Sequence, residues 1–464
     1  LRYKKEKIDV SAYGFTKSDL ATFQAVYYGV VNDHPEFYYV KTAYRYWSYS
    51  SGEIVSVEPQ YMDYDFDDEA FQQATQEAMS LIDDDMTEVE KALVLHDYIA
   101  VTCAYDYDNY KAGTLPEMVY NSYGALVERS AVCQGYALAY KYLLGQAGIQ
   151  AYMVSSKSMN HAWNIVRLDG EYYQVDVTWD DPTSDRIGRA RHYYMFISDT
   201  AFKNSRKHYG WTVTTASEET DITATNTQYD DVFWTNCDAQ ITVQDHKYYY
   251  VDGKDATKIG IRVRDYAGES IDTLTTIPYW TVWNSRGWWN GAYTGLSRLD
   301  DMLVYNDKEN IYAINRDGTG KKVLFAPDIT EGYIYGSYCE DDTLFYILAQ
   351  SPNEEGKLYY TELTFEDTEI ESITLDQTEL VLDEKGTSAL KATIKPARAN
   401  KSALHWTSSN SGVATVTAED GSLEAKITAV KEGSCTIKVS DGTHEASCEV
   451  TVCKKLDKPV FTPA

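Results

Sequence analysis

Three short stretches decide the fold of this chain: Ser130-Ala131-Val132-Cys133-Gln134-Gly135-Tyr136-Ala137, Asn160-His161-Ala162-Trp163-Asn164 and Val175-Asp176-Val177-Thr178-Trp179. They supply a thiol, an imidazole and a carboxylate, in that order. A nucleophilic cysteine acts as a thiolate, so it needs a base that removes its proton and surroundings that stabilise its charge. The three stretches therefore indicate a nucleophile, its base and a group that orients the base.

Cys133 is expected at the start of a helix. Apolar side chains follow it at helical spacing at Ala137, Tyr140 and Leu144. The first turn of a helix carries unpaired N–H groups and the positive end of the helix dipole. Both features favour a thiolate at this position.

The Asp-Gly pair at 169–170 predicts a two-residue turn between two β-rich runs. That turn pairs Leu168 with Glu171. In the same register, His161 and Asp176 lie on one face as diagonal neighbours, with Cβ atoms about 7 Å apart. A carboxylate there can hold the imidazole in the tautomer that accepts the thiol proton.

The second strand of this hairpin is expected to continue to Trp179, which sets Trp163 opposite Asp176 and His161 opposite Thr178. Alternation along the two strands then assigns the other face to the core. The residues predicted on that core face are Val166, Leu168, Tyr173, Val175, Val177 and Trp179.

These residues resemble the transglutaminase-like superfamily, a papain-like group in which a nucleophile helix packs on a β-sheet. The resemblance covers roughly residues 75 to 211. It also includes His96-Asp97-Tyr98, Tyr105-Asp106-Tyr107, Asp180-Asp181-Pro182 and His192-Tyr193-Tyr194-Met195-Phe196-Ile197. Family members often carry glycines just before the Val-Cys pair, whereas this chain has Glu128-Arg129-Ser130-Ala131. The resemblance implies that Cys133 is the nucleophile, His161 the base and Asp176 the orienting acid.

Other polar residues near these stretches are candidates for supporting roles. Gln134, Trp163 and Asn164 have two equally good interpretations, support of the site or simple packing. An oxyanion hole needs the Cys133 N–H and one further donor. Tyr105 and Tyr123 are both candidates for that donor, and the sequence does not choose between them.

Two further motifs are read as structural. Thr87-Glu88-Val89-Glu90 predicts a capping box that opens a helix to about Val101. His96 lies on the apolar face of that helix, so it is interpreted as a hydrogen-bonded core residue. Asp180 and Asp181 are expected to cap the turn at Pro182 rather than to shape the site.

The composition excludes several classes of function. The net charge is 42 − 71 = −29, so nucleic acid and anionic lipid are poor partners. No apolar run is long enough to span a membrane. The seven cysteines form no Cys-x-x-Cys pair, so neither a metal site nor a cofactor is predicted. The chain starts at Leu1, so we expect it to be part of a longer protein without its targeting segment.

The pattern of 464 residues predicts a multidomain α+β protein. An N-terminal extension (1–70) packs on a papain-like transglutaminase core (71–215). Hairpins dominate an all-β, propeller-blade-like repeat domain (220–366), and residues 370–453 resemble a bacterial Ig-like β-sandwich of group 2, followed by a tail (454–464). Cys435 and Cys448 are symmetric about Asp441-Gly442, which predicts opposite positions on a hairpin, as buried thiols rather than a disulfide.

Two functions of different classes fit these features. The first is a secreted or surface thiol enzyme that acts on amide or peptide bonds through a thioester. Hydrolysis by a cysteine peptidase or amidase is slightly favoured over amine transfer, with peptides, proteins or cell-wall peptides as substrates. The second is a non-catalytic adhesion protein that uses the same fold as a scaffold. The sequence does not indicate an oligomeric state.

Overall fold

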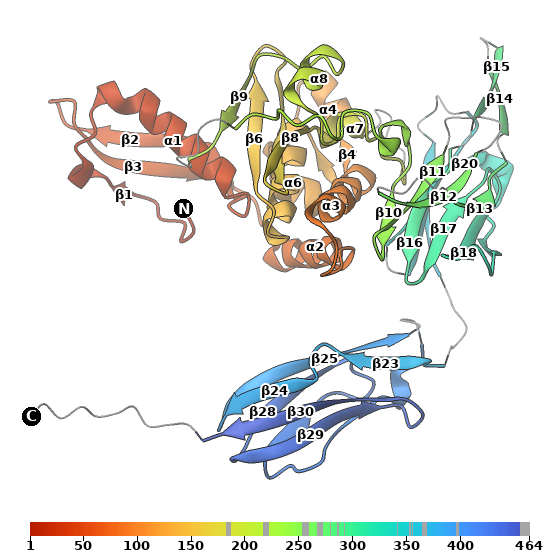
Figure 1. The fold of residues 1–464 in the computed structure, drawn as a ribbon. Helices are drawn as coiled ribbons and strands as arrows, with labels where there is room; N and C mark the ends of the chain where they lie inside the picture. Colours follow the sequence, from red (N-terminus) through yellow and green to blue (C-terminus); the bar gives the residue numbers. More distant parts are fainter. Residues whose placement is uncertain are drawn as a thin grey trace, which may run out of the picture. The chain divides into compact units, whose positions relative to one another are not determined.

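The computed structural model describes residues 1–454 apart from 182–186, 217–221, 253–258, 267–271, 279, 285–286, 292, 341, 352–353, 355, 364–368 and 396–398. The chain forms two compact units, Leu1–Thr361 and Glu362–Ala464. Helices and strands are mixed in the first half and strands dominate the second, as predicted for a multidomain α+β chain (Figure 1). Of the predicted tail, only Lys454 belongs to the described residues.

The N-terminal residues form a small sheet with one helix beside it. The sheet has the order β1-β3-β2, and α1 contacts β6 and β9 of the next sheet. The elements are β1 (Ile8–Asp9), α1 (Leu20–Asp33), β2 (Val40–Ser48) and β3 (Ile54–Tyr61). Hydrogen bonds such as that from Lys141 Nζ to Asp33 Oδ1 (2.6 Å) join this extension to the following residues.

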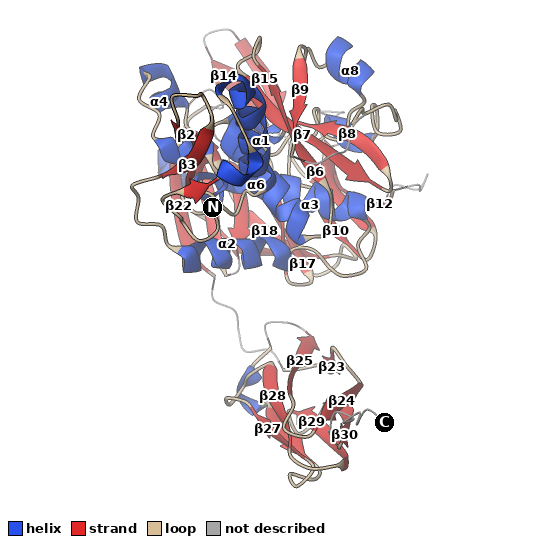
Figure 2. Ribbon diagram, turned by 90° about the vertical axis from the view of Figure 1, so that its left-hand side faces the viewer, coloured by secondary structure: helices blue, strands red, loops and turns tan. Residues whose placement is uncertain are grey.

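A four-stranded antiparallel sheet with the order β8-β7-β6-β9 is the centre of the next region. Helix α6 packs on β6 and β7, and α3 packs on α6 (Figures 1 and 2). The helices are α2 (Asp68–Ser80), α3 (Glu88–Thr102), α4 (Tyr107–Ala112), the 3₁₀-helix η3 (Glu117–Tyr120), α5 (Ser122–Leu126), α6 (Cys133–Gln146), α7 (Val177–Asp180) and α8 (Asp199–Asn204). The strands are β4 (Ala104–Tyr105), β5 (Ser130–Ala131), β6 (Ala151–Ser156), β7 (His161–Leu168), β8 (Glu171–Val175) and β9 (Trp211–Thr214).

The predicted hairpin of β7 and β8 is present in the predicted register. Leu168 pairs with Glu171, and both turn residues have positive φ angles, 50° at Asp169 and 86° at Gly170. The prediction is wrong at the far end, because β8 stops at Val175 and α7 follows. Asp176 caps this helix by accepting a hydrogen bond from the Trp179 N–H (3.2 Å). Thr178 therefore does not pair with His161.

Helix α3 begins with the predicted capping box. The Thr87 hydroxyl accepts from the Glu90 N–H (3.2 Å), and the Glu90 carboxylate accepts from the Thr87 N–H (2.8 Å). The core face of the β7–β8 hairpin is also as predicted for Val166, Leu168, Tyr173, Val175 and Val177, which are all buried. Trp179 differs, since α7 turns it toward His161.

The middle region consists of antiparallel sheets made of consecutive strands. Their orders are β10-β11-β12-β13, β14-β15, β16-β17-β18-β19 and β20-β21-β22. The strands are β10 (Thr242–Gln244), β11 (Lys247–Asp252), β12 (Gly260–Asp265), β13 (Asp272–Thr276), β14 (Trp280–Asn284), β15 (Gly287–Gly291), β16 (Leu296–Leu299), β17 (Met302–Asn306), β18 (Ile311–Asn315), β19 (Lys322–Phe325), β20 (Tyr333–Glu340), β21 (Thr343–Ala349) and β22 (Lys357–Glu362). Hairpins of consecutive strands, such as β17–β18, dominate this region, as predicted for residues 220–366.

The second unit is a sandwich of two four-stranded sheets, β23-β25-β28-β27 and β24-β30-β29-β26. Its strands are β23 (Ser372–Leu375), β24 (Glu379–Asp383), β25 (Thr387–Lys395), β26 (His405–Ser408), β27 (Ala414–Thr417), β28 (Glu424–Ala429), β29 (Gly433–Ser440) and β30 (Glu445–Cys453). Alternate residues of the inner strands, such as Leu390, Ile427 and Val450, fill the space between the sheets.

The register predicted for Cys435 and Cys448 is wrong by two residues. Cys435 pairs with Val450, and Cys448 pairs with Ile437. The reason is a four-residue connection in which the Asp441 carboxylate accepts from two N–H groups of its own loop. The two thiols are free and buried, as expected.

Within the described residues, no helix is both long and apolar enough to cross a membrane.

Candidate active site

Cys133 is the first residue of α6, as predicted. The preceding residue, Val132, caps the helix without any side-chain hydrogen bond. The Gly135 and Tyr136 N–H groups donate to the Val132 carbonyl oxygen at 2.8 and 3.2 Å, and the positive end of the helix dipole lies at the cysteine. The thiol is partly exposed, while Tyr140 and Leu144 on the same helix are fully buried.

Gly135, two positions after the cysteine, lies where a side chain would clash with its neighbours. A Cβ atom at Gly135 would lie 2.5 Å from the Val119 carbonyl oxygen and 2.9 Å from the Ala131 Cβ. The glycine thus lets the segment around η3 approach the first turn of α6. Val119 also accepts a hydrogen bond from the Val132 N–H (2.9 Å), which holds this approach.

His161 links the cysteine to the carboxylate. Its Nε2 donates to Asp176 Oδ2 at 2.6 Å, and the Cys133 thiol lies near enough to the ring to raise its pKa. Since Asp176 occupies Nε2, Nδ1 is the nitrogen left to accept the thiol proton. Burial alone would lower the pKa of His161, but Asp176 and then Cys133 raise it to about 10. The imidazole is therefore a strong base for the thiol proton.

His208 is a member of this site that the sequence did not reveal. Its Nε2 donates to Asp176 Oδ2 at 2.8 Å, and its Nδ1 contacts the Arg206 carbonyl oxygen at 3.1 Å. Burial would raise the pKa of Asp176, but His161 and then His208 lower it to about 2. No local pattern marks His208 in the sequence, because its partner lies 32 residues away.

Aromatic rings enclose the two histidines. Trp179 stacks on His161, with ring centroids 5.3 Å apart, and also lies against His208 at 4.3 Å. Trp163 is 5.6 Å from His161, and its Nε1 donates to Gln174 Oε1 at 2.7 Å. These low-polarity walls strengthen the charge interactions inside the site.

Asn164 and Gln134, the other two candidates for support, have different positions. Asn164 is buried, and its Nδ2 donates to the Ala137 carbonyl oxygen at 3.0 Å, which ties β7 to α6. Gln134 lines a cavity of about 380 Å³ between α6, η3 and the N-terminal extension. Neither residue contacts His161 among the described hydrogen bonds.

The two candidates for the second oxyanion donor are now distinguishable. Tyr105 pairs with Ala131 on the strand that leads into α6. Burial raises the pKa of Tyr105 first, and the nearby Cys133 raises it further. Tyr123 is instead buried among Tyr38, Phe66 and Phe71, and its hydroxyl accepts from the Asp67 N–H at 3.1 Å. The structure thus disagrees with Tyr123 as a donor.

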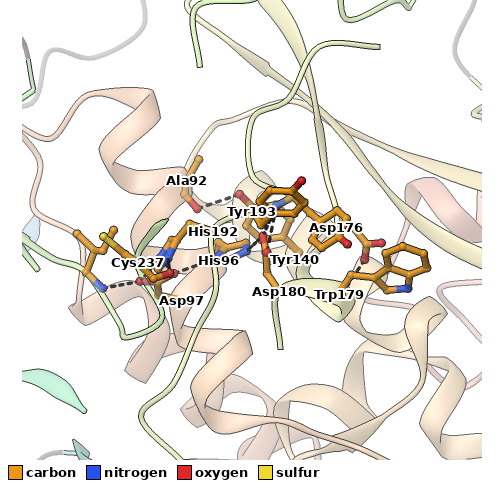
Figure 3. Close-up of polar contacts among 12 residues, drawn as sticks. Ala92, His96, Asp97, Tyr140, Asp176, Trp179, Asp180, His192, Tyr193 and Cys237 are labelled. Atoms are coloured by element: carbon orange, nitrogen blue, oxygen red, sulfur yellow. Dashed lines mark hydrogen bonds and ion pairs between the residues drawn. The ribbon is translucent and has the colours of Figure 1, made fainter. Parts of the chain in front are cut away.

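A row of buried charged residues lies behind the site (Figure 3). His192 Nε2 contacts Asp97 at 2.9 Å, Asp97 accepts from His96 Nδ1 at 2.8 Å, and His96 Nε2 contacts Asp180 Oδ2 at 3.2 Å. Burial lowers the pKa of His96, but Asp180 and Asp97 outweigh it and raise the pKa to about 9. His96 is therefore a hydrogen-bonded core residue, as interpreted from the sequence.

Asp180 and Asp181 do more than cap a turn. Asp180 accepts from the Tyr194 N–H at 3.0 Å as well as from His96, so it fixes α7 directly after Asp176. Asp181 accepts from the Tyr136 hydroxyl at 2.6 Å. Pro182, the turn that they were expected to cap, lies outside the described residues.

Two groups of described residues bring three potential metal ligands together. They are His96, Asp97 and His192, and His161, Asp176 and His208. In the first group each ring nitrogen already faces a carboxylate or carbonyl oxygen. In the second, Asp176 accepts from both histidines. Hydrogen bonds thus satisfy both groups without an ion.

Comparison with known proteins identifies two domains. The profile of the transglutaminase-like superfamily matches residues 75–177, and that of the bacterial Ig-like domain (group 2) matches residues 369–452. No curated protein matches the chain.

Similarity between this chain and solved structures is low. One described as a TGase is 14% identical over 30% of this chain and 44% of that chain, with a TM-score of 0.22. Domains 5–6 of the S-layer protein SbsC are 27% identical over 18% of this chain and 44% of that chain, with a TM-score of 0.17. The chain thus spans less than half the length of each of these two structures.

Proposed function

We propose that the transglutaminase-like domain of this chain is a thiol enzyme that acts on amide or peptide bonds. Cys133 Sγ attacks the carbonyl carbon while His161 takes the thiol proton. His161 then gives that proton to the leaving amine, and a thioester forms on Cys133 as the C–N bond breaks. Water or a second amine attacks the thioester and restores the free thiol.

One observation carries this proposal: Cys133, at the start of a helix, lies beside His161, and His161 Nε2 is hydrogen-bonded to Asp176. Asp176 stabilises the imidazolium that forms when the thiol loses its proton. The backbone N–H of Cys133 and the Tyr105 hydroxyl are the candidate donors for the oxyanion. The Cys133 side chain is partly exposed, so a substrate can reach the thiol.

Hydrolysis is slightly favoured over amine transfer. The side chain of Cys133 is partly exposed. Water can therefore reach the thioester, and no special arrangement is needed to activate it beyond His161. Amine transfer requires exclusion of that water by the acceptor.

A peptide library tests the reaction and its acceptor. The protein is incubated with the library with and without a primary amine, and the products are identified by mass spectrometry. A free carboxylate, at a new C-terminus or on a deamidated side chain, indicates hydrolysis. The amine attached at that carbonyl indicates transfer, and at a side-chain amide it adds the mass of the amine minus ammonia. The Cys133→Ala protein is the control. Absence of both products in the unmodified protein contradicts the proposal.

Alkylation separates an enzyme from an adhesion scaffold that retains the fold. Iodoacetamide at pH 6–7 should label Cys133 faster than Cys453, an exposed thiol of the same chain. The His161→Ala substitution should abolish the difference. Equal rates for the two thiols, unchanged by the substitution, favour the scaffold function.

We also propose that the protein acts outside the bacterial cell or on its surface, on peptides, proteins or cell-wall peptides. The Ig-like domain at 369–452 supports this location, because such domains stand on exported proteins. Protease treatment of intact cells tests it, since a surface protein is digested while cytoplasmic proteins are not.

A further inference from the structure

We propose that the cavity beside Gln134 binds an apolar side chain of the acyl-donor peptide, and that the N-terminal extension thereby determines substrate preference. The inference rests on the proposed function and names its specificity pocket. The cavity measures about 380 Å³, within the range of about 300–1,000 Å³ that is typical of ligand pockets.

The cavity lies against the first turn of α6, beside the nucleophile. Tyr120 and Asn121 at the end of η3 and Gln134 in the first turn of α6 all line it. Gln134 follows Cys133 directly in the chain. The Asn121 carbonyl oxygen lies 3.1 Å from a Cβ atom placed on Gly135, so the end of η3 reaches this turn. In this proposal, a substrate bound at Cys133 passes the mouth of the cavity.

The walls are largely apolar and come from two parts of the chain. Phe37 and Val40 of the extension and Leu138 of α6 all line the cavity. The apolar residues that line it are Val31, Pro35, Phe37, Tyr38, Val40, Ala43, Met62 and Leu138. Such walls favour an aromatic or branched aliphatic side chain over a charged one, which would lose its hydration.

Polar contacts hold the two walls in place. Lys41 and Glu117 form an ion pair of 2.7 Å between β2 and η3. The Ser122 hydroxyl donates to the Pro35 carbonyl oxygen at 2.6 Å, and Asn121 Nδ2 donates to the Tyr38 carbonyl oxygen at 3.0 Å. The pocket is thus formed before a substrate arrives, which reduces the entropy lost on binding.

Binding to the inactive Cys133→Ala protein tests the pocket independently of turnover. The probes are acetylated pentapeptides that differ only at the central residue, from Gly and Ala to Leu, Phe and Trp. We expect the Leu, Phe and Trp peptides to bind roughly tenfold or more tightly than the Gly peptide, measured by fluorescence anisotropy.

Substitutions at the exposed rim assign this preference to the cavity. Thr42 and Ala43 both line the cavity and are exposed, so Thr42→Trp and Ala43→Trp fill it without disturbing the core. At least one of them should reduce the preference to about threefold or less. Ala21→Trp is the matched control, since Ala21 is an exposed residue of α1 outside the cavity.

Two results overturn the inference: equal binding of all the peptides, or a preference that persists in both rim variants. Failure of the proposed function has a different signature. In that case the apolar peptides bind selectively to the Cys133→Ala protein, but the unmodified protein neither cleaves them nor attaches an amine.

Discussion

Asp176 accepts hydrogen bonds from two histidines, and this double contact determines how the candidate site responds to charge. The carboxylate is 1% exposed, so it has almost no water to replace a lost partner. A buried carboxylate without donors is strongly destabilised. His161 and His208 therefore both contribute to keeping Asp176 ionised, although only His161 reaches the thiol.

The Asp176→Asn substitution should lower kcat by about 10²–10⁴-fold, because the amide neither orients nor stabilises the imidazolium. It should also change stability with pH. The lowered pKa of Asp176, about 2, contributes roughly 2 kcal/mol of stability. This contribution is complete above pH 3.8 and is lost as the pH falls toward 2.

The raised pKa of His161, about 10, acts at the other end of the pH scale. Its contribution is complete below pH 6.5 and is lost as the pH rises toward 10. Urea denaturation compares the unmodified protein with the Asp176→Asn protein from pH 3 to 9. The difference in their free energy of unfolding should be largest between pH 4 and 6.5. A difference that stays constant from pH 3 to 9 contradicts the ion pair.

His208 is a positioning residue in this view, and its role is testable by a pair of variants. His208→Leu removes a donor to Asp176 and should lower kcat by roughly 5- to 100-fold with little change in KM. His208→Gln keeps an N–H donor and should recover most of the rate. The acidic limb of the pH–rate profile should move to higher pH in the Leu variant only. Equal losses in both variants indicate a packing role instead.

At the scale of elements, the site depends on the two segments that flank β8, a turn before it and helix α7 after it. The turn at Asp169 and Gly170 sets the register that brings His161 and Asp176 to one end of the hairpin. Helix α7 then ends the strand and turns Trp179 onto His161. A one-residue slip at the first turn would move His161 to the opposite face of the sheet.

Gly170→Ala should destabilise the protein by about 1–2 kcal/mol, because the φ angle of 86° is unfavourable for a residue with a Cβ atom. Gly145→Ala is the matched control on an exposed position of α6, where an added Cβ meets no atom within 4 Å. It should stabilise by about 0.5–1 kcal/mol, because alanine favours the helix. Urea denaturation measures both, and effects of the same sign contradict the argument.

For the molecule as a whole, the core of the transglutaminase-like region continues into the first segments of the middle region. Trp234, Cys237, Ile241 and Tyr248 belong to the same buried cluster as the helices α3 and α6. Backbone groups of this segment also complete the buried charges, since Ile241 N–H donates to Asp97 Oδ2 at 2.7 Å. Residues up to 361 therefore form one folding unit, and the Ig-like sandwich forms another.

Two fragments test this division. A fragment of residues 1–361 should keep the thermal unfolding temperature of the first unit and the alkylation rate of Cys133. A fragment of residues 1–216 loses several large buried side chains, each worth about 1.5–3 kcal/mol, and should not unfold cooperatively in calorimetry. A stable, reactive 1–216 fragment would show that the transglutaminase-like region folds alone.

Features that depend on neighbours along the chain could be predicted from the amino-acid sequence. The helix start at Cys133, the capping box at Thr87 and the register of the β7–β8 hairpin each follow from a pattern of a few residues. Short-range sterics and hydrogen bonds decide such features, so a local pattern is sufficient. The positions of Cys133, His161 and Asp176 follow from these elements and the resemblance to a known family.

Contacts between groups that are distant in the sequence became known from the three-dimensional fold. His208 donates a hydrogen bond to Asp176, and the Ile241 N–H donates one to Asp97. Residues of the N-terminal extension line the cavity beside Gln134. The strand register that separates Cys435 from Cys448 likewise depends on hydrogen bonds within a loop of four residues. Buried polar groups take whichever partner the packing of the whole chain brings within about 3 Å. No pattern of neighbouring residues encodes that choice.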